Sequence, residues 1–196
     1  MNITVLVSGG GSNLQSIIDR IESGYLDQAR IVQVISSRRG AYALERAARA
    51  GIPGACIDKD QFPEEKGRCR AILERLRETG TDLVVLAGYM NILDPDIIEA
   101  YRNRIINIHP SLIPSYCGKG FYGKRVHRAV LDGCETESGA TVHFVDEGVD
   151  TGRIILQERV PVEPGDTEDT LAARVLEVEH RILPQAIKLF CEGGIR

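Results

Sequence analysis

Short apolar runs alternate along this chain with segments of helical periodicity. Residues 3–7 and 82–87 are almost continuously apolar, as expected for strands that are covered on both faces. After the first run, apolar residues between Leu14 and Ile21 recur at the spacing of one helix face. This alternation predicts an α/β fold with a doubly wound, mostly parallel open sheet and right-handed crossovers.

The same signals predict where the individual elements begin and end. Strands are expected at residues 3–7, 31–36, 54–57, 82–87, 105–108, 139–145 and 153–162. Helices are expected at residues 14–21, 42–50, 64–79, 95–101, 126–131 and 168–192. Ser12 or Asn13 is the natural N-cap of the first helix, and Pro184 should interrupt the last one.

Composition limits the class of protein. A length of 196 residues with 43% hydrophobic residues suits one well-buried core, so residues 1–196 are expected to form a single domain. The start lacks a signal sequence and no run approaches a membrane span, which predicts a cytoplasmic protein without membrane contact. Five scattered cysteines without a C-x-x-C pair predict reduced thiols and no structural zinc. A net charge of -4 argues against nucleic acid as a partner.

A glycine-rich segment, Ser8–Asn13, joins the first strand to the first helix. Such a loop presents backbone N–H groups at the positive end of a helix dipole, which favours an anion such as phosphate. The segment is neither the dinucleotide fingerprint, because Leu14 replaces the last glycine, nor a P-loop, because G-K-[ST] is absent. A tight turn without a ligand is the alternative.

An amide and an imidazole share one face of the strand around residue 107. If residues 105–108 are extended, Asn107 and His109 point to the same side, and Pro110 stops the strand just after them. Ligands of open α/β sheets bind at this carboxyl end of the strands. The alternative is a strand end with incidental polar residues.

Three further segments allow both a functional and an ordinary interpretation. The apolar loop Met90–Leu93 could line a pocket for a flat ring, or pack in the core. The segment 146–152, with three acidic residues and two glycines, might suggest a calcium-binding loop, but it lacks the ligand spacing of one. Glu179 and His180 are explained adequately by a solvated helix face.

Four segments together carry a resemblance to a known family. They are SGGGSNLQ at residues 8–15, LAGYM at 86–90, NIHPSL at 107–112, and HFV at 143–145 followed by DTG at 150–152. Spread over nearly the whole chain, they closely resemble the phosphoribosylglycinamide formyltransferases. The N-x-H-P-S-L signature with a later Asp belongs to all 10-formyltetrahydrofolate-dependent formyltransferases, and the glycine loop narrows the resemblance.

The resemblance implies a Rossmann-like formyltransferase fold with a C-terminal antiparallel strand portion and a C-terminal helix. It implies transfer of a formyl group from 10-formyltetrahydrofolate, as co-substrate, to the amine of N1-(5-phospho-D-ribosyl)glycinamide in de novo purine (IMP) biosynthesis. No metal is implied, the partners are these small molecules, and the protein is expected to be a monomer or homodimer.

Residue roles carry over from the family by position. The implied catalytic residues are Asn107, His109 and Asp150, with Asp150 expected to raise the pKa of His109 and orient its ring. The implied ribonucleotide-binding residues are Gly11, Ser12 and Asn13 at the phosphate, and Glu179. The implied folate-binding residues are Met90, Asn91, Ile92, Leu93, Asn107, Asp146, Glu147, Gly148, Val149 and Asp150.

The chain departs from many relatives in two places. Residues 62–66 lack an arginine that often meets the folate, so only Lys66 could approximate that role. The loop Cys117–Lys124 is longer than the Pro-Gly form, and its glycines and aromatic rings predict a mobile cover over the cleft rather than rings packed on the core.

Related activities are the alternatives. Because the catalytic segment begins at residue 2 and the chain ends at residue 196, we expect neither the C-terminal nucleic-acid-binding domain of methionyl-tRNA formyltransferase nor the N-terminal regulatory domain of formyltetrahydrofolate hydrolase. The hydrolase activity itself stays an alternative. So does a non-catalytic folate- or nucleotide-binding module, which would leave Asn107, His109 and Asp150 unexplained.

Overall fold

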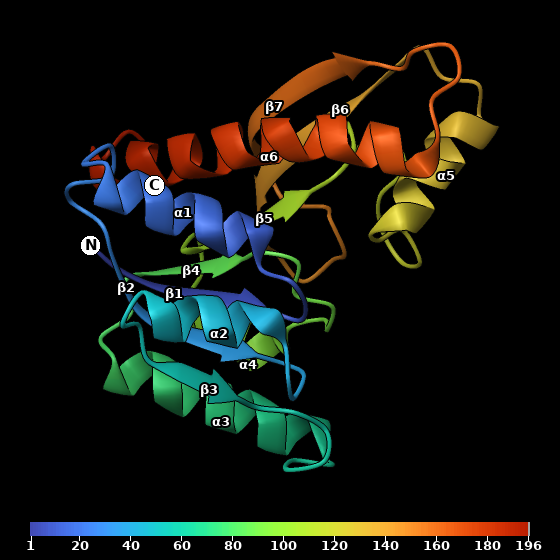
Figure 1. Cartoon of the computed structure of the whole chain (residues 1–196). Helices are drawn as coiled ribbons and strands as arrows, with labels where there is room; N and C mark the ends of the chain where they lie inside the picture. The colour runs from blue at the N-terminus through green and yellow to red at the C-terminus, as the bar shows by residue number, and fades with distance from the viewer. Residues whose placement is uncertain (196) are drawn as a thin grey trace.

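A computed structural model describes residues 1–195 and contains one mixed seven-stranded sheet (Figure 1). The strands are β1 (Asn2–Val7), β2 (Arg30–Ser36), β3 (Gly54–Cys56), β4 (Leu83–Leu86), β5 (Ile105–His109), β6 (Glu137–Phe144) and β7 (Ile154–Pro161). Their order in the sheet is β3-β2-β1-β4-β5-β6-β7. β1 to β5 are parallel, whereas β6 and β7 are antiparallel to their neighbours, which confirms the predicted fold class.

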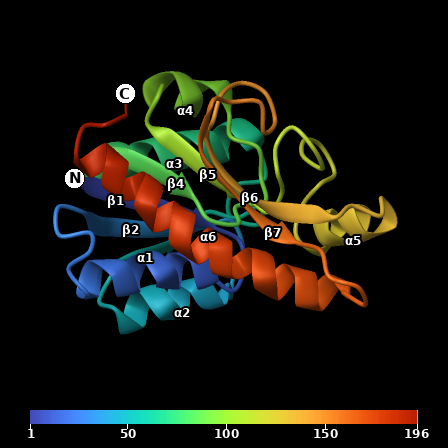
Figure 2. The same ribbon diagram turned by 90° about the horizontal axis from the view of Figure 1, so that it is seen from above.

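Helices cover both faces of the sheet (Figures 1 and 2). They are α1 (Ser12–Glu22), α2 (Tyr42–Arg49), α3 (Glu65–Glu78), α4 (Pro95–Ala100), α5 (Lys124–Asp132) and α6 (Glu168–Cys191). One core cluster joins the sheet to α1, α2 and α6, and a second joins it to α3 and α4. β1 alternates between these clusters, because Ile3 and Val5 face the first while Leu6 faces the second. A strand buried on both sides explains why the run reads as continuously apolar.

Two expectations about the helices are wrong. α1 begins at Ser12, and its N-cap is Gly11 in the left-handed conformation, with φ of 73°. A side chain at Gly11 would place its Cβ 2.6 Å from Cβ of Ala43, so the close approach of α2 accounts for a glycine here. α6 runs without interruption through Pro184, which lies on the buried face of the helix. Tertiary packing of that face outweighs the hydrogen bond that proline removes.

The strand order brings the chemically interesting loops to one edge of the sheet. From β1 the chain proceeds to β2 on one side, and β4 later pairs with β1 on the other. The strand order therefore reverses between β1 and β4, and open α/β sheets bind ligands outside the carboxyl ends of the strands at such a reversal. The glycine loop follows β1, Gly88–Met90 follows β4, and His109 ends β5.

No helix in residues 1–195 has the length and apolarity needed to cross a membrane.

Candidate active site

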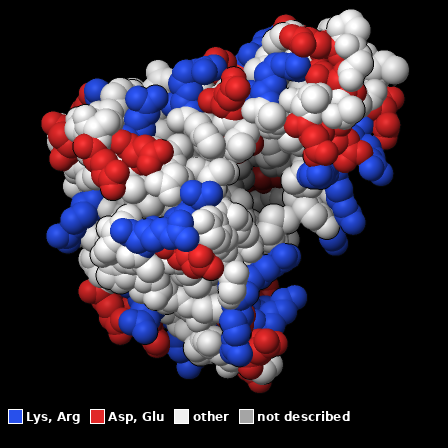
Figure 3. Space-filling model, in the orientation of Figure 1, with Lys and Arg blue, Asp and Glu red and all other residues white. Residues whose placement is uncertain are grey.

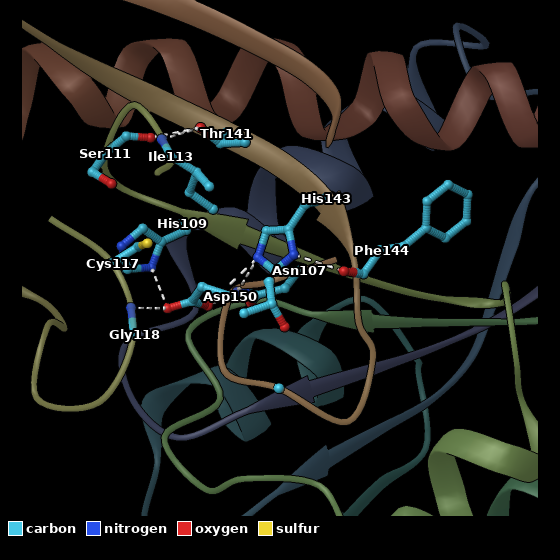
Figure 4. A network of polar contacts seen from close by, with 12 residues as sticks. Asn107, His109, Ser111, Ile113, Cys117, Gly118, Thr141, His143, Phe144 and Asp150 are labelled. Carbon is cyan, nitrogen blue, oxygen red and sulfur yellow. Dashed lines mark hydrogen bonds and ion pairs between the residues drawn. The ribbon is translucent and has the colours of Figure 1, made fainter. Parts of the chain in front are cut away.

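Asn107 and His109 lie on the same face of β5, as the alternation predicts. Their cross-strand neighbours on β6 are His143, opposite Asn107, and Thr141, opposite His109. Figure 4 shows the side chains of Asn107, His109 and His143 gathered around the carboxylate of Asp150. His109 and His143 are buried, so this polar cluster lies largely out of water.

Asp150 reaches the cluster from the loop between β6 and β7. Its Oδ2 lies 3.6 Å from Nδ1 of His109 and accepts the backbone N–H of Gly118 at 2.9 Å. Its Oδ1 lies 3.4 Å from Nδ2 of Asn107 and 3.5 Å from Nε2 of His143. The residue is held with φ of 58°, a left-handed conformation that a non-glycine residue adopts at some cost. The structure therefore brings together the three residues expected to be catalytic.

Burial and charge act in opposite directions on the titration of this cluster. Desolvation lowers the pKa of His109 below its ordinary value, although Asp150 and the carbonyl of Tyr116 both act to raise it. Asp150 thus acts to raise the pKa of His109, as expected, but desolvation outweighs it and the net shift is downward. Burial by itself raises the pKa of Asp150, but hydrogen bonding to His143, the proximity of His109 and the Gly118 N–H together lower it. Asp150 is consequently ionised at neutral pH.

His143 is a further member of the site, and no role was predicted for it from the sequence. Its Nδ1 lies 2.7 Å from the carbonyl oxygen of Phe144, so Nδ1 carries a proton that it donates there. With Nδ1 protonated, Nε2 accepts an N–H of Asn107 at 3.1 Å when it carries no proton, and donates towards Oδ1 of Asp150 at 3.5 Å when it carries one. His143 thus fixes the orientation of the Asn107 amide. The register of β5 against β6 creates this contact, and the motif around His143 is its only sequence signal.

An open cleft of about 300 Å³ borders the cluster. Met90, Asn91, Ile92 and Leu93 line one side, and Asp146, Gly148, Val149 and Asp150 line another. Met90 and Ile92 are exposed apolar residues, at 40% and 62%, which supports the pocket interpretation for these two, whereas Leu93 is buried in the second core cluster. Gly118–Gly123 also lines the cleft, so the long loop borders it. The space-filling view shows the molecule hollowed between the body that carries α1 and α2 and the arm that carries α5, with acidic atoms at the floor (Figure 3).

The glycine loop is connected to α6 through a buried contact. Nδ2 of Asn13 donates to Oε2 of Glu179 at 2.5 Å, and Glu179 is 8% exposed. The interpretation of Glu179 as part of a solvated face is therefore wrong. Burial raises the pKa of Glu179 to about 7, although the Asn13 hydrogen bond acts to lower it. Oδ1 of Asn13 is buried and has no hydrogen-bond partner within residues 1–195. Gly11, Ser12, Asn13 and Glu179 thus form one polar group at the start of α1.

Other charged and metal-binding candidates lie beside the cleft. A neighbouring cleft is lined by Lys59 and Arg68, whereas Lys66 belongs to neither lining among the described residues. Cys69, Asp94 and Asp96 bring potential ligand atoms within 4.8 Å of one another. Burial, with Asp94 adding to it, raises the pKa of the Cys69 thiol to about 12. A neutral thiol is a poor metal ligand.

A family model, related sequences and solved structures all point to the same protein family. The model of the formyl transferase family matches residues 1–187. Phosphoribosylglycinamide formyltransferase of Haemophilus influenzae is 45% identical over 99% of this chain and 89% of its own length. The trifunctional purine biosynthetic protein adenosine-3 of Drosophila pseudoobscura pseudoobscura is 45% identical over 99% of this chain, which spans only 14% of that protein.

A solved structure extends the likeness to three dimensions. Glycinamide ribonucleotide transformylase 1 from Symbiobacterium toebii superimposes with a TM-score of 0.93 at 46% identity, over 98% of this chain and 88% of that one. The family match, the full-length identity and the shared fold agree with the motifs at residues 8–15 and 107–112. This chain belongs to the formyl transferase family and, within it, to the phosphoribosylglycinamide formyltransferases.

Proposed function

We propose that this chain transfers the formyl group of 10-formyltetrahydrofolate to the amine of N1-(5-phospho-D-ribosyl)glycinamide, as a step of de novo purine (IMP) biosynthesis. The observation that carries the proposal is the convergence of Asn107, His109 and Asp150 at the carboxyl end of β5, beside an open cleft. A module that only binds folate or nucleotide needs no such cluster of groups suited to acid–base chemistry.

The reaction needs positioning and charge stabilisation more than a covalent intermediate. The primary amine attacks the formyl carbon on N10, and a tetrahedral intermediate with an oxyanion forms. The C–N10 bond then breaks, N10 gains a proton and the former amine loses one. Because a formyl group on N10 is already activated, two correctly placed substrates and donors aimed at the oxyanion suffice.

His109 is suited to act as the proton donor. Nε2 faces the carbonyl of Tyr116 at 3.0 Å and Nδ1 faces Asp150, so both ring nitrogens point at acceptors. The imidazolium, which donates from both nitrogens, is the form that this pair of acceptors favours. The neighbouring carboxylate thereby offsets part of the desolvation that disfavours the charged ring.

Asn107 is suited to bind the oxyanion. Its Nδ2 lies near His143 and Asp150, at 3.1 and 3.4 Å. The contact to Asp150 is longer and therefore weaker than the contact to His143. The amide N–H of Asn107 that points at Asp150 is thus the one available to a developing oxyanion. We therefore propose that substrate replaces Asp150 as the partner of this N–H, while His143 keeps the other.

The two substrates are assigned to opposite sides of this cluster. The folate ring is assigned to the cleft lined by Met90–Leu93, Asp146 and Gly148–Asp150. Glu147, also expected at the folate, is absent from this lining and pairs with Arg102 at 3.0 Å. The phosphate of the ribonucleotide binds at Gly11, Ser12 and Asn13, where the start of α1 favours an anion. Glu179 accepts a hydrogen bond from Asn13, and we propose that it also helps to hold the ribonucleotide.

The direct test is a two-substrate assay. With both substrates present, the purified protein should release tetrahydrofolate and formylated ribonucleotide in a one-to-one ratio. Adding a chelator should not change the rate. If folate is released equally fast without the ribonucleotide, the protein is a formyltetrahydrofolate hydrolase. If both substrates bind and neither is consumed, the chain is a binding module.

The cover role of the loop Cys117–Lys124 can be tested separately. Phe121 and Tyr122 are 36% and 44% exposed and both line the cleft, so replacing both with Ala should raise KM or lower kcat by at least about 10-fold through poorer exclusion of water. Thermal stability should change little, because exposed rings contribute little to the core. Unchanged activity, or a stability loss of about 3–5 kcal/mol for each ring as in a core deletion, would contradict this role.

A further inference from the structure

The glycine loop is clamped from the side by α2. The backbone N–H of Ala43 donates to the carbonyl of Gly9 at 3.1 Å. The position that a Cβ on Gly11 would occupy lies 2.6 Å from Cβ of Ala43 and 3.5 Å from Cδ of Arg46. The first turn of α2 therefore packs directly against the loop, and the shape of the loop depends on this helix.

Arg46 holds the loop through its side chain. Its Nε donates to the carbonyl of Gly10 at 2.8 Å, and its Nη1 donates to Oε1 of Gln15 at 3.0 Å. Gln15 is held in turn, because its Nε2 donates to Asp19 at 2.8 Å. The guanidinium also lies over the ring of Tyr42, 5.0 Å from its centroid. These contacts fix the guanidinium in one place beside the start of α1.

The position of Arg46 matters for an anion at this loop. A carbonyl oxygen that pointed at a bound phosphate would repel it. By donating to the carbonyl oxygen of Gly10, Arg46 keeps that oxygen directed towards α2. The first N–H groups of α1 have no acceptor within the helix, and among the described residues no side chain caps them. Arg46 also adds a fixed positive charge beside the loop, because its guanidinium is held by the carbonyl of Gly10 and by Gln15 in the first turn of α1.

We propose that Arg46 is a positioning residue for the phosphate site: it fixes the Gly10 carbonyl so that the loop keeps its anion-binding shape, and it supplies the charge that favours a phosphate monoester. The proposal rests on the proposed function for the identity of the substrate, but phosphate binding can be measured without turnover. Its effect should appear in binding rather than in the chemical step, because Arg46 lies on α2, away from His109 on β5.

The test compares Arg46→Gln with Arg49→Gln. Arg49 lies one turn further along the same helix, where its guanidinium meets Tyr42 and Glu45 instead of the glycine loop. The probe is ribose 5-phosphate measured by titration calorimetry, with ribose as the uncharged control. Arg46→Gln should raise the Kd of ribose 5-phosphate by roughly 10-fold or more, as expected for a lost charge-assisted hydrogen bond, whereas Arg49→Gln should stay within about 2-fold.

Turnover provides the second readout. Arg46→Gln should raise KM for the ribonucleotide by a similar factor, with kcat and KM for 10-formyltetrahydrofolate within about 3-fold of the parent. Arg46→Lys keeps the charge without the planar fork, so it should recover only part of the affinity. Because Arg46→Lys is expected to fold, it also allows the proposal to be tested if Arg46→Gln is unstable.

Four outcomes would overturn the proposal. They are equal effects of the Gln variants at positions 46 and 49, a loss confined to kcat, full recovery of affinity with Lys, and failure of the parent to bind ribose 5-phosphate. If the parent binds ribose 5-phosphate in an Arg46-dependent way but transfers no formyl group, the proposed function fails and this inference stands.

Discussion

Replacing Asp150 with Asn should lower kcat by about 100-fold to 1,000-fold while the protein stays folded. The substitution keeps the shape of the side chain, and one amide oxygen can still accept the N–H of Gly118. It removes the negative charge 3.6 Å from Nδ1 of His109. Without that charge the buried imidazolium loses its main electrostatic support, so less of the proton donor is present in the transition state.

The pH dependence of the same variant gives a signed prediction. Asp150 acts to raise the pKa of His109, so its loss should lower that pKa further. A reaction that needs protonated His109 fails as pH rises through this pKa, and the alkaline limb of the kcat profile should therefore move to lower pH. Asp60→Asn, at an exposed acid outside the cleft, is the control. Turnover within a few-fold of the parent, or an unmoved alkaline limb, would exclude this role for Asp150.

Gly152→Ala should destabilise the fold by about 3 kcal/mol and lower activity at the same time. A Cβ on Gly152 would lie 1.9 Å from the carbonyl oxygen of Phe144 and 2.7 Å from its carbon, and backbone atoms cannot move aside cheaply. The same carbonyl accepts Nδ1–H of His143. Relieving the clash must therefore displace either the loop that carries Asp150 or the contact that fixes His143.

Gly67→Ala is the matched control for this substitution. Gly67 lies inside α3, and a Cβ there meets nothing within 4 Å among the described residues. Alanine should therefore stabilise the helix by up to about 1 kcal/mol. Urea unfolding of the two variants measures the difference directly. A Gly152→Ala midpoint equal to that of the parent would show that the β6–β7 loop adapts without cost.

The sheet is predictable from the sequence because its signals are local. A strand buried on both faces leaves a continuous apolar run, and the period of two along β5 is sufficient to place Asn107 and His109 on one face. Asp150 is expected only through the resemblance to the family. Its contact with His109 depends on the path of the β6–β7 loop, which no local pattern encodes.

The sequence misleads where tertiary contacts overrule local preference. Glu179 has the polarity of a surface residue, yet α6 packs it against Asn13 from the other end of the chain. Gly11 takes the place of the expected serine or asparagine cap because α2 leaves no room for a side chain. The role of His143 could not be predicted, because its contact with Asn107 depends on the register of β5 against β6. The hydrophobic pattern alone does not determine that register in detail.

The hydrogen bond from His109 to the carbonyl of Tyr116 links a proton to the position of a loop. The Tyr116 carbonyl acts to raise the pKa of His109, and Tyr116 lies two residues before Gly118, where the loop begins to line the cleft. Thermodynamic linkage is reciprocal, so a loop that increases the proton affinity of His109 must itself be held more firmly when His109 is protonated. In the proposed mechanism His109 passes a proton to the leaving nitrogen, and that extra hold is then lost. If the loop is the proposed cover, the chemical step loosens it at the moment when products must depart.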